Sequence, residues 1–203
     1  MGCVVTGRSE GERGLGMFLT CEHVVGLAGN GASTEVPVVV EQPAPVNQIG
    51  QLPDFSVGVV RRVGGISFVA RGNRVDAAVV VTDPGIELDT CPMHWPSSIS
   101  RIAEPRGGMR VVKVGCTTGL REGVVTDAAV DWSVDYADRG SAHFHGVTLY
   151  RCRCEPGDSG AAVLDADTGA LVGLHFAGRG MDAVMCPITA VFAALRVQLP
   201  ERA

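Results

Sequence analysis

Short apolar runs separated by turn-forming residues follow one another along most of the chain. Each run is rich in Val, Ile, Leu or Thr and is bounded by Gly, Pro, Asp or Asn, a pattern typical of β-strands joined by tight turns. The runs predicted to be strands are 2–8, 36–41, 56–63, 65–70, 75–81, 109–115, 123–130, 146–152, 160–165, 170–176 and 183–188. Many short strands at modest spacing favour an all-β fold of barrels or a sandwich.

One segment near the C-terminus has the periodicity of a helix instead. Its apolar residues recur at steps of three and four, which places them on one face of a helix: Ile188, Val191, Leu195 and Leu199. Thr189 is predicted to cap its start and Pro200 to end it. We therefore expect a single helix over about 189–199 that closes an otherwise all-β chain.

The composition changes between 84 and 108, where Pro, Ser and Gly are frequent and periodicity is weak. This change predicts a connection between two β halves. The expected organisation is an N-terminal β-barrel over 1–83, a connection over 84–108, and a C-terminal β-barrel over 109–203 that includes the closing helix.

The first residues have two interpretations. They are predicted to form an opening strand, and the alternative is a myristoylation signal, because they fit the pattern M-G-x-x-x-T with Cys3 beside the glycine.

Composition and charge narrow the classes of partner. The chain has 203 residues, 46% of them apolar and 19% charged, so a substantial core can form. Its net charge is −5 and it contains no basic run, so neither nucleic acid nor an anionic membrane is an expected partner. No apolar stretch is long enough to span a bilayer and the first residues lack a secretory signal, so we expect a cytoplasmic protein.

The seven cysteines form no C-x-x-C pair, and their number is odd. Cys152 and Cys154 occupy alternate positions of one predicted strand, so their side chains should point to the same face. Reduced, mostly buried thiols fit a cytoplasmic protein better than disulfides or a zinc site do. We expect no metal and no organic cofactor.

Three local stretches carry candidate chemistry: His23 in FLTCEHVVG, Asp76 in NRVDAAVVV and Ser159 in CEPGDSGAAVLD. A serine hydroxyl is a poor nucleophile at neutral pH and needs a base, which histidine supplies. A carboxylate on the other ring nitrogen fixes the tautomer and stabilises the imidazolium. Glycines around the serine let main-chain N–H groups reach a developing oxyanion, and we expect those of Gly157 and Ser159 to form that hole.

These stretches resemble elements of the chymotrypsin-like (trypsin-fold) serine peptidases of the small bacterial type. His23 lies in a match to T-A-x-H-V-V, with Cys21 where alanine is usual, Asp76 matches D-x-A-V-V, and 157–160 match G-D-S-G. Further stretches resemble a strand–turn element, the strand lining the substrate cleft, and the last strand with its helix: 114–125, 171–178 and 186–195. The resemblance covers nearly the whole chain.

The resemblance implies two six-stranded Greek-key β-barrels packed across a catalytic cleft, with a C-terminal helix. The first barrel is expected either to be complete or to lack one strand. The order His23, Asp76, Ser159 argues against an α/β-hydrolase, which runs Ser, Asp, His and uses G-x-S-x-G. Here Ala161 stands at the last glycine position, and too few residues follow the serine for the rest of that fold.

Each candidate residue also has a structural interpretation. His23 could be a core histidine, Ser159 a turn residue, and Asp76 a turn former at a strand start. The carboxylates that compete with Asp76 for the acid role are Asp54, Asp83 and Asp89. We expect Asp158 to brace the loop behind the serine and to take no part in the chemistry.

The resemblance implies a serine endopeptidase that forms an acyl-enzyme on Ser159, with His23 as base and then acid. The expected partners are a protein or peptide substrate and, as a further candidate, a regulatory protein. We expect an intracellular bacterial regulatory or defence protease. The alternative is a non-catalytic or latent trypsin-fold binding module that awaits a partner.

The substrate pocket is expected to be built from Arg153, Cys154, His175, Phe176, Ala177 and Gly178. Arg153 stands where members with a basic preference carry an acid, and His175 stands where the glutamyl endopeptidases have a histidine that binds an acidic side chain. We therefore predict that the residue before the scissile bond is acidic or small, not basic. The alternative is that Arg153 faces solvent and sets no preference.

Overall fold

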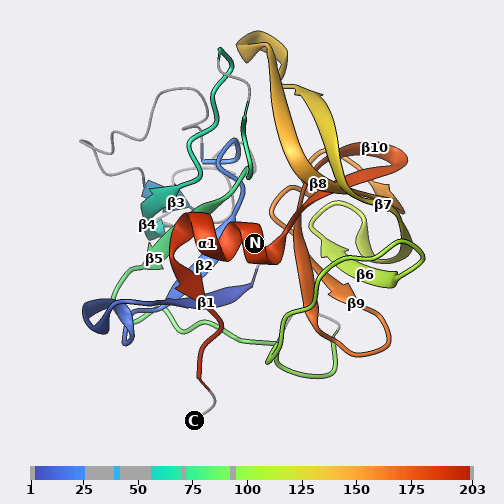
Figure 1. Ribbon diagram of the computed structural model, residues 1–203. Coiled ribbons are helices and arrows are strands. Elements are labelled where there is room, and N and C mark those ends of the chain that lie inside the picture. The colour runs from blue at the N-terminus through green and yellow to red at the C-terminus, as the bar shows by residue number, and fades with distance from the viewer. Residues whose placement is uncertain (1–2, 26–38, 42–55, 70–71, 92–94, 202–203) are drawn as a thin grey trace, which may run out of the picture.

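A computed structural model describes residues 3–25, 39–41, 56–69, 72–91 and 95–201. The predicted strand positions 36–38, the competing carboxylate Asp54 and the first two residues of the myristoylation pattern lie outside these ranges. Within them the chain is mostly β, with one α-helix near the C-terminus (Figure 1). The predicted fold class is confirmed. No helix of the described ranges is long and apolar enough to cross a membrane.

The first sheet is built mainly from the N-terminal half of the chain. Its strand order is β11-β1-β2-β5-β4-β3, with all neighbours antiparallel. The bounds are β1 (Val4–Gly7), β2 (Met17–Thr20), β3 (Val39–Glu41), β4 (Ser56–Val63), β5 (Ala78–Thr82) and β11 (Val197–Gln198), with a 3-10 turn η1 (Glu10–Glu12) after β1. Among the described residues this sheet reaches six strands only because β11 returns from the C-terminal end.

The second sheet is a closed antiparallel barrel with the order β10-β8-β7-β6-β9. Its strands are β6 (Arg110–Gly115), β7 (Gly119–Asp135), β8 (Ser141–Cys154), β9 (Ala162–Asp165) and β10 (Leu171–Pro187), with a 3-10 turn η3 (Ala137–Arg139) between β7 and β8. The two predicted runs 170–176 and 183–188 are both parts of β10. Its first part pairs with β9 and its second with β8, so one long strand serves two neighbours. The described barrel therefore has five named strands where six were expected.

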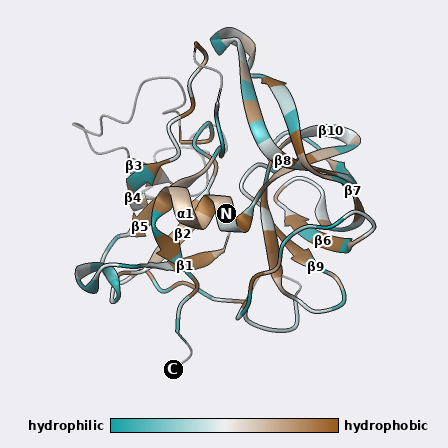
Figure 2. Ribbon diagram, viewed as in Figure 1, coloured by the Kyte–Doolittle hydropathy of each residue, from teal (hydrophilic) through white to brown (hydrophobic). Residues whose placement is uncertain are grey.

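The halves share the largest of the three clusters of buried apolar side chains found among the described residues. A single cluster of buried side chains contains Leu19 of β2, Phe144 of β8 and Leu174 of β10 together with the buried face of the helix. Hydropathy follows this arrangement, with apolar residues along β2, β5 and β9 and polar residues at η1 and on the outer part of the β7–β8 hairpin (Figure 2). Because the core runs between the halves, it fixes the edges at which the candidate residues meet.

The helix α1 (Ile188–Leu195) is shorter than the predicted 189–199, and its start is not capped by Thr189. Pro187 occupies the N-cap position without a side-chain cap. The helix ends because Arg196 adopts a left-handed conformation with φ of 53°. The chain then turns so that Val197 and Gln198 pair with β1.

The predicted strand over 65–70 is wrong in its described part, residues 65–69. The N–H groups of Gly65 and Ile66 donate to the carboxylate of buried Glu22, at 2.7 and 3.0 Å. The N–H of Ser67 donates to Oδ1 of Asn73 at 2.8 Å. Side chains therefore take the hydrogen bonds that a strand partner would need.

All seven cysteines are unpaired, and five of them are buried: Cys3, Cys21, Cys152, Cys154 and Cys186. Burial raises the pKa of the Cys3 thiol to about 12 and that of Cys152 to about 11, so both remain protonated at neutral pH.

Between β5 and β6, residues 84–91 and 95–108 contain no named strand. We propose that this segment divides the two barrels, although β11 crosses back to the first.

Candidate active site

His23 and Asp76 come from the ends of two paired strands. His23 lies in the turn after β2 and Asp76 lies just before β5, and Thr20 stands opposite Ala78 in the pair. Nδ1 of His23 is 2.5 Å from Oδ2 of Asp76, and the main-chain N–H of His23 donates to Oδ1 at 3.2 Å. The Asp76 side chain is fully buried, whereas that of His23 is 24% exposed. The imidazole is thus held from one edge.

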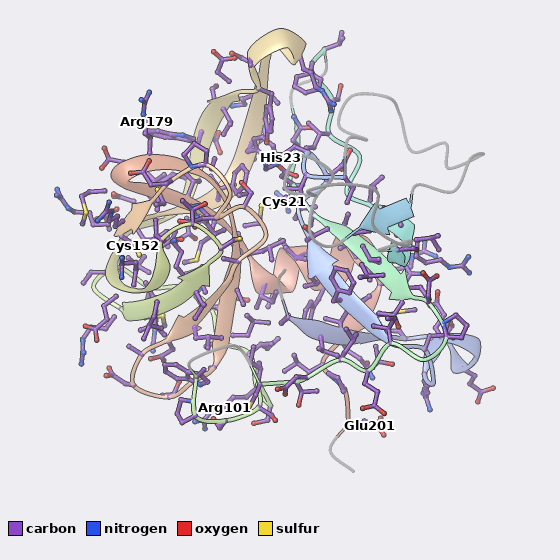
Figure 3. All side chains as sticks on the ribbon, turned by 180° about the vertical axis from the view of Figure 1, so that it is seen from behind. Cys21, His23, Arg101, Cys152, Arg179 and Glu201 are labelled. Atoms are coloured by element: carbon purple, nitrogen blue, oxygen red, sulfur yellow. The ribbon has the colours of Figure 1, made fainter. Side chains whose placement is uncertain are left out.

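Figure 3 places Cys21 and His23 where the two halves of the molecule meet. Nε2 of His23 has no hydrogen-bond partner within the described ranges. A proton on Nδ1, directed at the carboxylate, leaves the Nε2 lone pair available as a base. Asp83 and Asp89 are engaged elsewhere, by the hydroxyl of Ser56 and the N–H of Cys91.

Two further groups hold the Asp76 carboxylate and its backbone. The phenol of Tyr136, just after β7, donates to Oδ2 at 2.8 Å, and the Asp76 N–H donates to Sγ of Cys186 at 3.3 Å. Burial and the charge of Asp76 raise the pKa of Tyr136 well above its usual value, so the phenol remains a donor. The Tyr136 and His23 rings meet edge to face, with centroids 5.5 Å apart. Tyr136 therefore acts as a positioning residue.

Ser159 lies in the turn that follows β8. With His23 it lines a pocket of about 450 Å³, whose wall includes Phe176, Ala177 and Gly178. The Ser159 hydroxyl donates to the Phe176 carbonyl at 3.4 Å, and no Ser159–His23 hydrogen bond forms between these two described side chains. Contacts between a nucleophile and its base are often long without substrate and tighten in the complex.

Bonded and unbonded main-chain N–H groups alternate along the turn around Ser159. The N–H of Asp158 donates to the Glu155 carbonyl and that of Gly160 to the His175 carbonyl, at 3.1 and 2.8 Å. Those of Gly157 and Ser159 have no acceptor among the described residues. Gly157 has φ of 100°, and a Cβ atom there would clash with Thr117 Oγ1, so the turn requires glycine at this position.

A buried ion pair supports this turn from behind. Lys113 of β6 is the only lysine in the chain, and its ammonium lies 2.7 Å from Oδ2 of Asp158, with both side chains fully buried. Asp158 also accepts from the hydroxyl and N–H of Thr118 and from the N–H groups of Thr117 and Glu155. Burial opposes ionisation of Asp158, but the bonds from Lys113 and Thr118 outweigh it and lower its pKa.

Three of the predicted pocket residues lie beside Ser159 and three do not. Phe176, Ala177 and Gly178 line the pocket described above. Those that do not line it are Arg153, Cys154 and His175. Arg153 is exposed on β8, and the Cys154 thiol is buried and donates to the Asp182 carbonyl at 3.5 Å.

His175 is buried behind the pocket. Its Nδ1 lies 2.8 Å from the Tyr150 hydroxyl, and both side chains are nearly inaccessible. Burial, with a smaller effect of the Lys113 charge, lowers the pKa of His175 to about 4. The imidazole is therefore neutral at neutral pH and carries no positive charge toward a substrate.

Cys21, His23 and Asp76 also have the residue types of a metal site, with ligand atoms within 4.8 Å of one another. The Asp76 carboxylate is already engaged by His23 and Tyr136. Burial raises the pKa of Cys21 well above its usual value, which disfavours the thiolate that a metal needs. The engaged carboxylate and the protonated thiol make these three residues a poor fit to a metal ion.

Sequence reasoning did not identify Tyr136, Cys186 or Lys113. Tyr136 and Cys186 contact Asp76 from positions far along the chain, and no local motif marks them. Lys113 could have been identified from the sequence, because it is a single charged residue inside the apolar run MRVVKVG. A charged residue in such a run predicts a buried partner of opposite charge, because buried charges are almost always paired.

Comparison with known proteins agrees with this arrangement. Residues 1–174 match the family described as trypsin-like peptidase domain. Protease A of Thermobifida fusca is 22% identical, with a TM-score of 0.66, over 100% of this chain and 91% of the other. Nocardiopsis protease (NAPase) is 20% identical, with a TM-score of 0.66, over 98% and 91%.

A glutamic acid specific serine protease, which uses a histidine triad in substrate binding, is 22% identical, with a TM-score of 0.65, over 97% and 92%. At these identities the structural likeness shows the double-barrel fold with its C-terminal helix. A search of curated protein sequences gives no match. The family match covers most of the chain, so the protein belongs to the trypsin-like peptidase family and is a serine endopeptidase by class.

Proposed function

We propose that Ser159, His23 and Asp76 form the catalytic triad of this peptidase. The observation that carries the proposal is the position of His23, held by buried Asp76 on one side and sharing a pocket with Ser159 on the other. His23 takes the Ser159 proton as the serine oxygen attacks the peptide carbonyl carbon. The free N–H groups of Gly157 and Ser159 then stabilise the oxyanion.

Collapse of the tetrahedral intermediate breaks the C–N bond, and His23 returns its proton to the leaving amine. The acyl group remains on Ser159 as an ester. Water then attacks this ester with His23 again acting as base, which releases the acid and restores the serine. These steps need only groups supplied by the chain and a water molecule.

The substrate would lie along the edge formed by Ala177 and Gly178. A second pocket, of about 550 Å³, adjoins the first and shares these two residues. Its wall includes the apolar side chains of Trp132 and Leu149. We place the residues preceding the scissile bond here, because a strand edge and apolar pockets together bind extended peptides.

Of the predicted preferences, a small residue before the scissile bond is better supported than an acidic one. A neutral, buried His175 bonded to Tyr150 offers no cation for a carboxylate. Arg153 is exposed and does not line the pocket. We therefore propose selection by size and apolar contact.

For the biological role we propose a bacterial intracellular protease with a regulatory or defence task. Its support is the set of free cysteines and the bacterial origin of similar structures. The alternative is a latent or non-catalytic module that awaits a partner. The observation behind that alternative is that the Ser159 hydroxyl bonds to the Phe176 carbonyl and not to His23.

Fluorogenic peptides that vary at the residue before the scissile bond test both function and preference. We expect cleavage after Ala, Val or Leu at least about ten-fold faster than after Glu, Lys or Arg, since even one methylene group in a hydrophobic pocket is worth roughly 10–200-fold. Preferential cleavage after Glu would overturn the proposed preference. No cleavage of any peptide, or of an unfolded protein, would favour the latent alternative.

A further inference from the structure

The β7–β8 hairpin carries a second cluster of ligand-type side chains, away from the triad. Asp131 lies on β7, and His143 and His145 lie two residues apart on β8, so they project from one face. One ligand atom from each lies within 4.8 Å of the others. Phe144, between the histidines, is fully buried on the opposite face. In Figure 1 the outer part of this hairpin projects beyond the other strands of its barrel.

The geometry of the three groups suits a metal ion. Nδ1 of His145 lies 2.8 Å from Oδ2 of Asp131, and the two histidine rings meet edge to face, with centroids 4.8 Å apart. Two imidazoles and one carboxylate form a donor set that late first-row divalent ions prefer, with further positions left for water. All three side chains are at least partly exposed, so an ion can reach them.

A neighbouring hydroxyl orients one of the histidines. Ser133 stands opposite His143 in the strand register, and its Oγ lies 2.9 Å from Nδ1 of His143. A proton on that Nδ1 leaves the Nε2 lone pair free to bind an ion. Histidines that bind metals usually have such an outer partner on their second nitrogen.

The backbone of the cluster is also anchored. The N–H of His145 donates to the Asn73 carbonyl at 2.9 Å, and the side-chain amide of Asn73 donates to the His143 carbonyl at 3.0 Å. Asn73 is buried and lies three residues before Asp76. The site is therefore held in place before any ion arrives, and it joins the hairpin to the segment that carries the acid.

We propose that Asp131, His143 and His145 bind a divalent transition-metal ion of the Zn²⁺ type, which braces the β7–β8 hairpin. This inference is independent of the proposed catalytic mechanism, because none of the three residues takes part in it. A bound ion would also restrain the position of Tyr136, because the same hairpin places the Tyr136 hydroxyl against Asp76.

Calorimetric titration of Zn²⁺ into the Ser159→Ala protein tests the site without self-digestion. We expect one equivalent to bind and the thermal midpoint to rise, since a ligand that binds only the folded state stabilises it. In the Ser159→Ala background, Ser133→Ala should weaken Zn²⁺ binding roughly 10–100-fold, because it removes an outer partner of His143. His145→Ala and Asp131→Ala each remove a ligand and should weaken Zn²⁺ binding further. Circular dichroism verifies that each variant is folded.

Two matched controls locate the ion. His23→Ala removes a histidine of the other candidate cluster, and Cys116→Ser removes an exposed thiol. Both should leave Zn²⁺ affinity and stoichiometry unchanged. Absence of binding, unchanged affinity in folded His145→Ala, or loss of binding in His23→Ala would each overturn the proposal.

Discussion

Replacing Asp76 with Asn is expected to lower kcat by a factor on the order of 10⁴ while the protein remains folded. Oδ2 of Asp76 accepts from both His23 Nδ1 and the Tyr136 hydroxyl. Oδ1 of Asp76 accepts from the main-chain N–H of His23, which cannot become an acceptor, so the NH₂ group of Asn takes the Oδ2 position. There it faces Nδ1 of His23 and favours the tautomer with its proton on Nε2. That nitrogen can then no longer accept the proton of Ser159.

The effect should be measured as kcat on the best fluorogenic peptide, with KM determined in parallel. KM should change little, because Asp76 is fully buried and does not line the pocket. Asp83→Asn is the matched control, since Asp83 bonds to Ser56 and belongs to the competing carboxylates. Activity of Asp76→Asn within ten-fold of the wild type would contradict the assigned role, as would an equal loss in Asp83→Asn.

Lys113→Met is expected to destabilise the fold by about 3–5 kcal/mol, the cost of leaving a buried charge without its partner. Methionine nearly fills the volume of the lysine stem, so the loss should come from Asp158 and not from a cavity. The control is Arg110→Met on the same strand, where an exposed arginine pairs with Asp167. Its cost should stay below about 1 kcal/mol.

Urea unfolding of the two variants measures this difference. Equal destabilisation would show that Lys113 contributes no more than a surface charge. Loss of the ion pair should also loosen the turn that holds the N–H groups of Gly157 and Ser159, because Asp158 lies between them. Lys113→Met should therefore lose activity even under conditions where it remains folded.

The same pair gives a pH dependence with a defined sign. The pKa of Asp158 is lowered in the folded state from an ordinary value of 3.8, so the unfolded chain binds its proton first as pH falls. The stabilisation from Asp158 is complete above that ordinary value and is lost as pH falls towards the lowered pKa. Unfolding free energies between pH 5 and pH 2.5 should fall less steeply in Lys113→Met than in the wild type.

Local pattern was sufficient to predict much of the fold. Short apolar runs predicted β5, β6 and β9, and each of these strands contributes side chains to the core that the two halves share. The strand predicted over 65–70 is wrong over 65–69, because the N–H groups of residues 65–67 bond to the side chains of Glu22 and Asn73 and an apolar pattern does not reveal such bonds. The helix was predicted too long because pairing of β11 with β1 depends on a contact distant in sequence.

The candidate site divides in a similar way. His23, Asp76 and Ser159 each sit in a recognisable local frame, whereas Tyr136 reaches Asp76 only through the three-dimensional course of the hairpin. The exposure of Arg153 was readable from strand alternation, since it follows buried Cys152 and precedes buried Cys154. The burial of His175 was not, because it depends on Tyr150 of the neighbouring strand.

The central claim is that Ser159 is a nucleophile activated within this fold. A fluorophosphonate probe, followed by mass spectrometry of the modified peptide, tests it most directly because the probe reports the reactive oxygen itself. We predict one adduct on Ser159 in the wild type, a much slower reaction in His23→Ala, and none in Ser159→Ala. An unlabelled wild type, or an adduct on another residue that persists in Ser159→Ala, would contradict the claim.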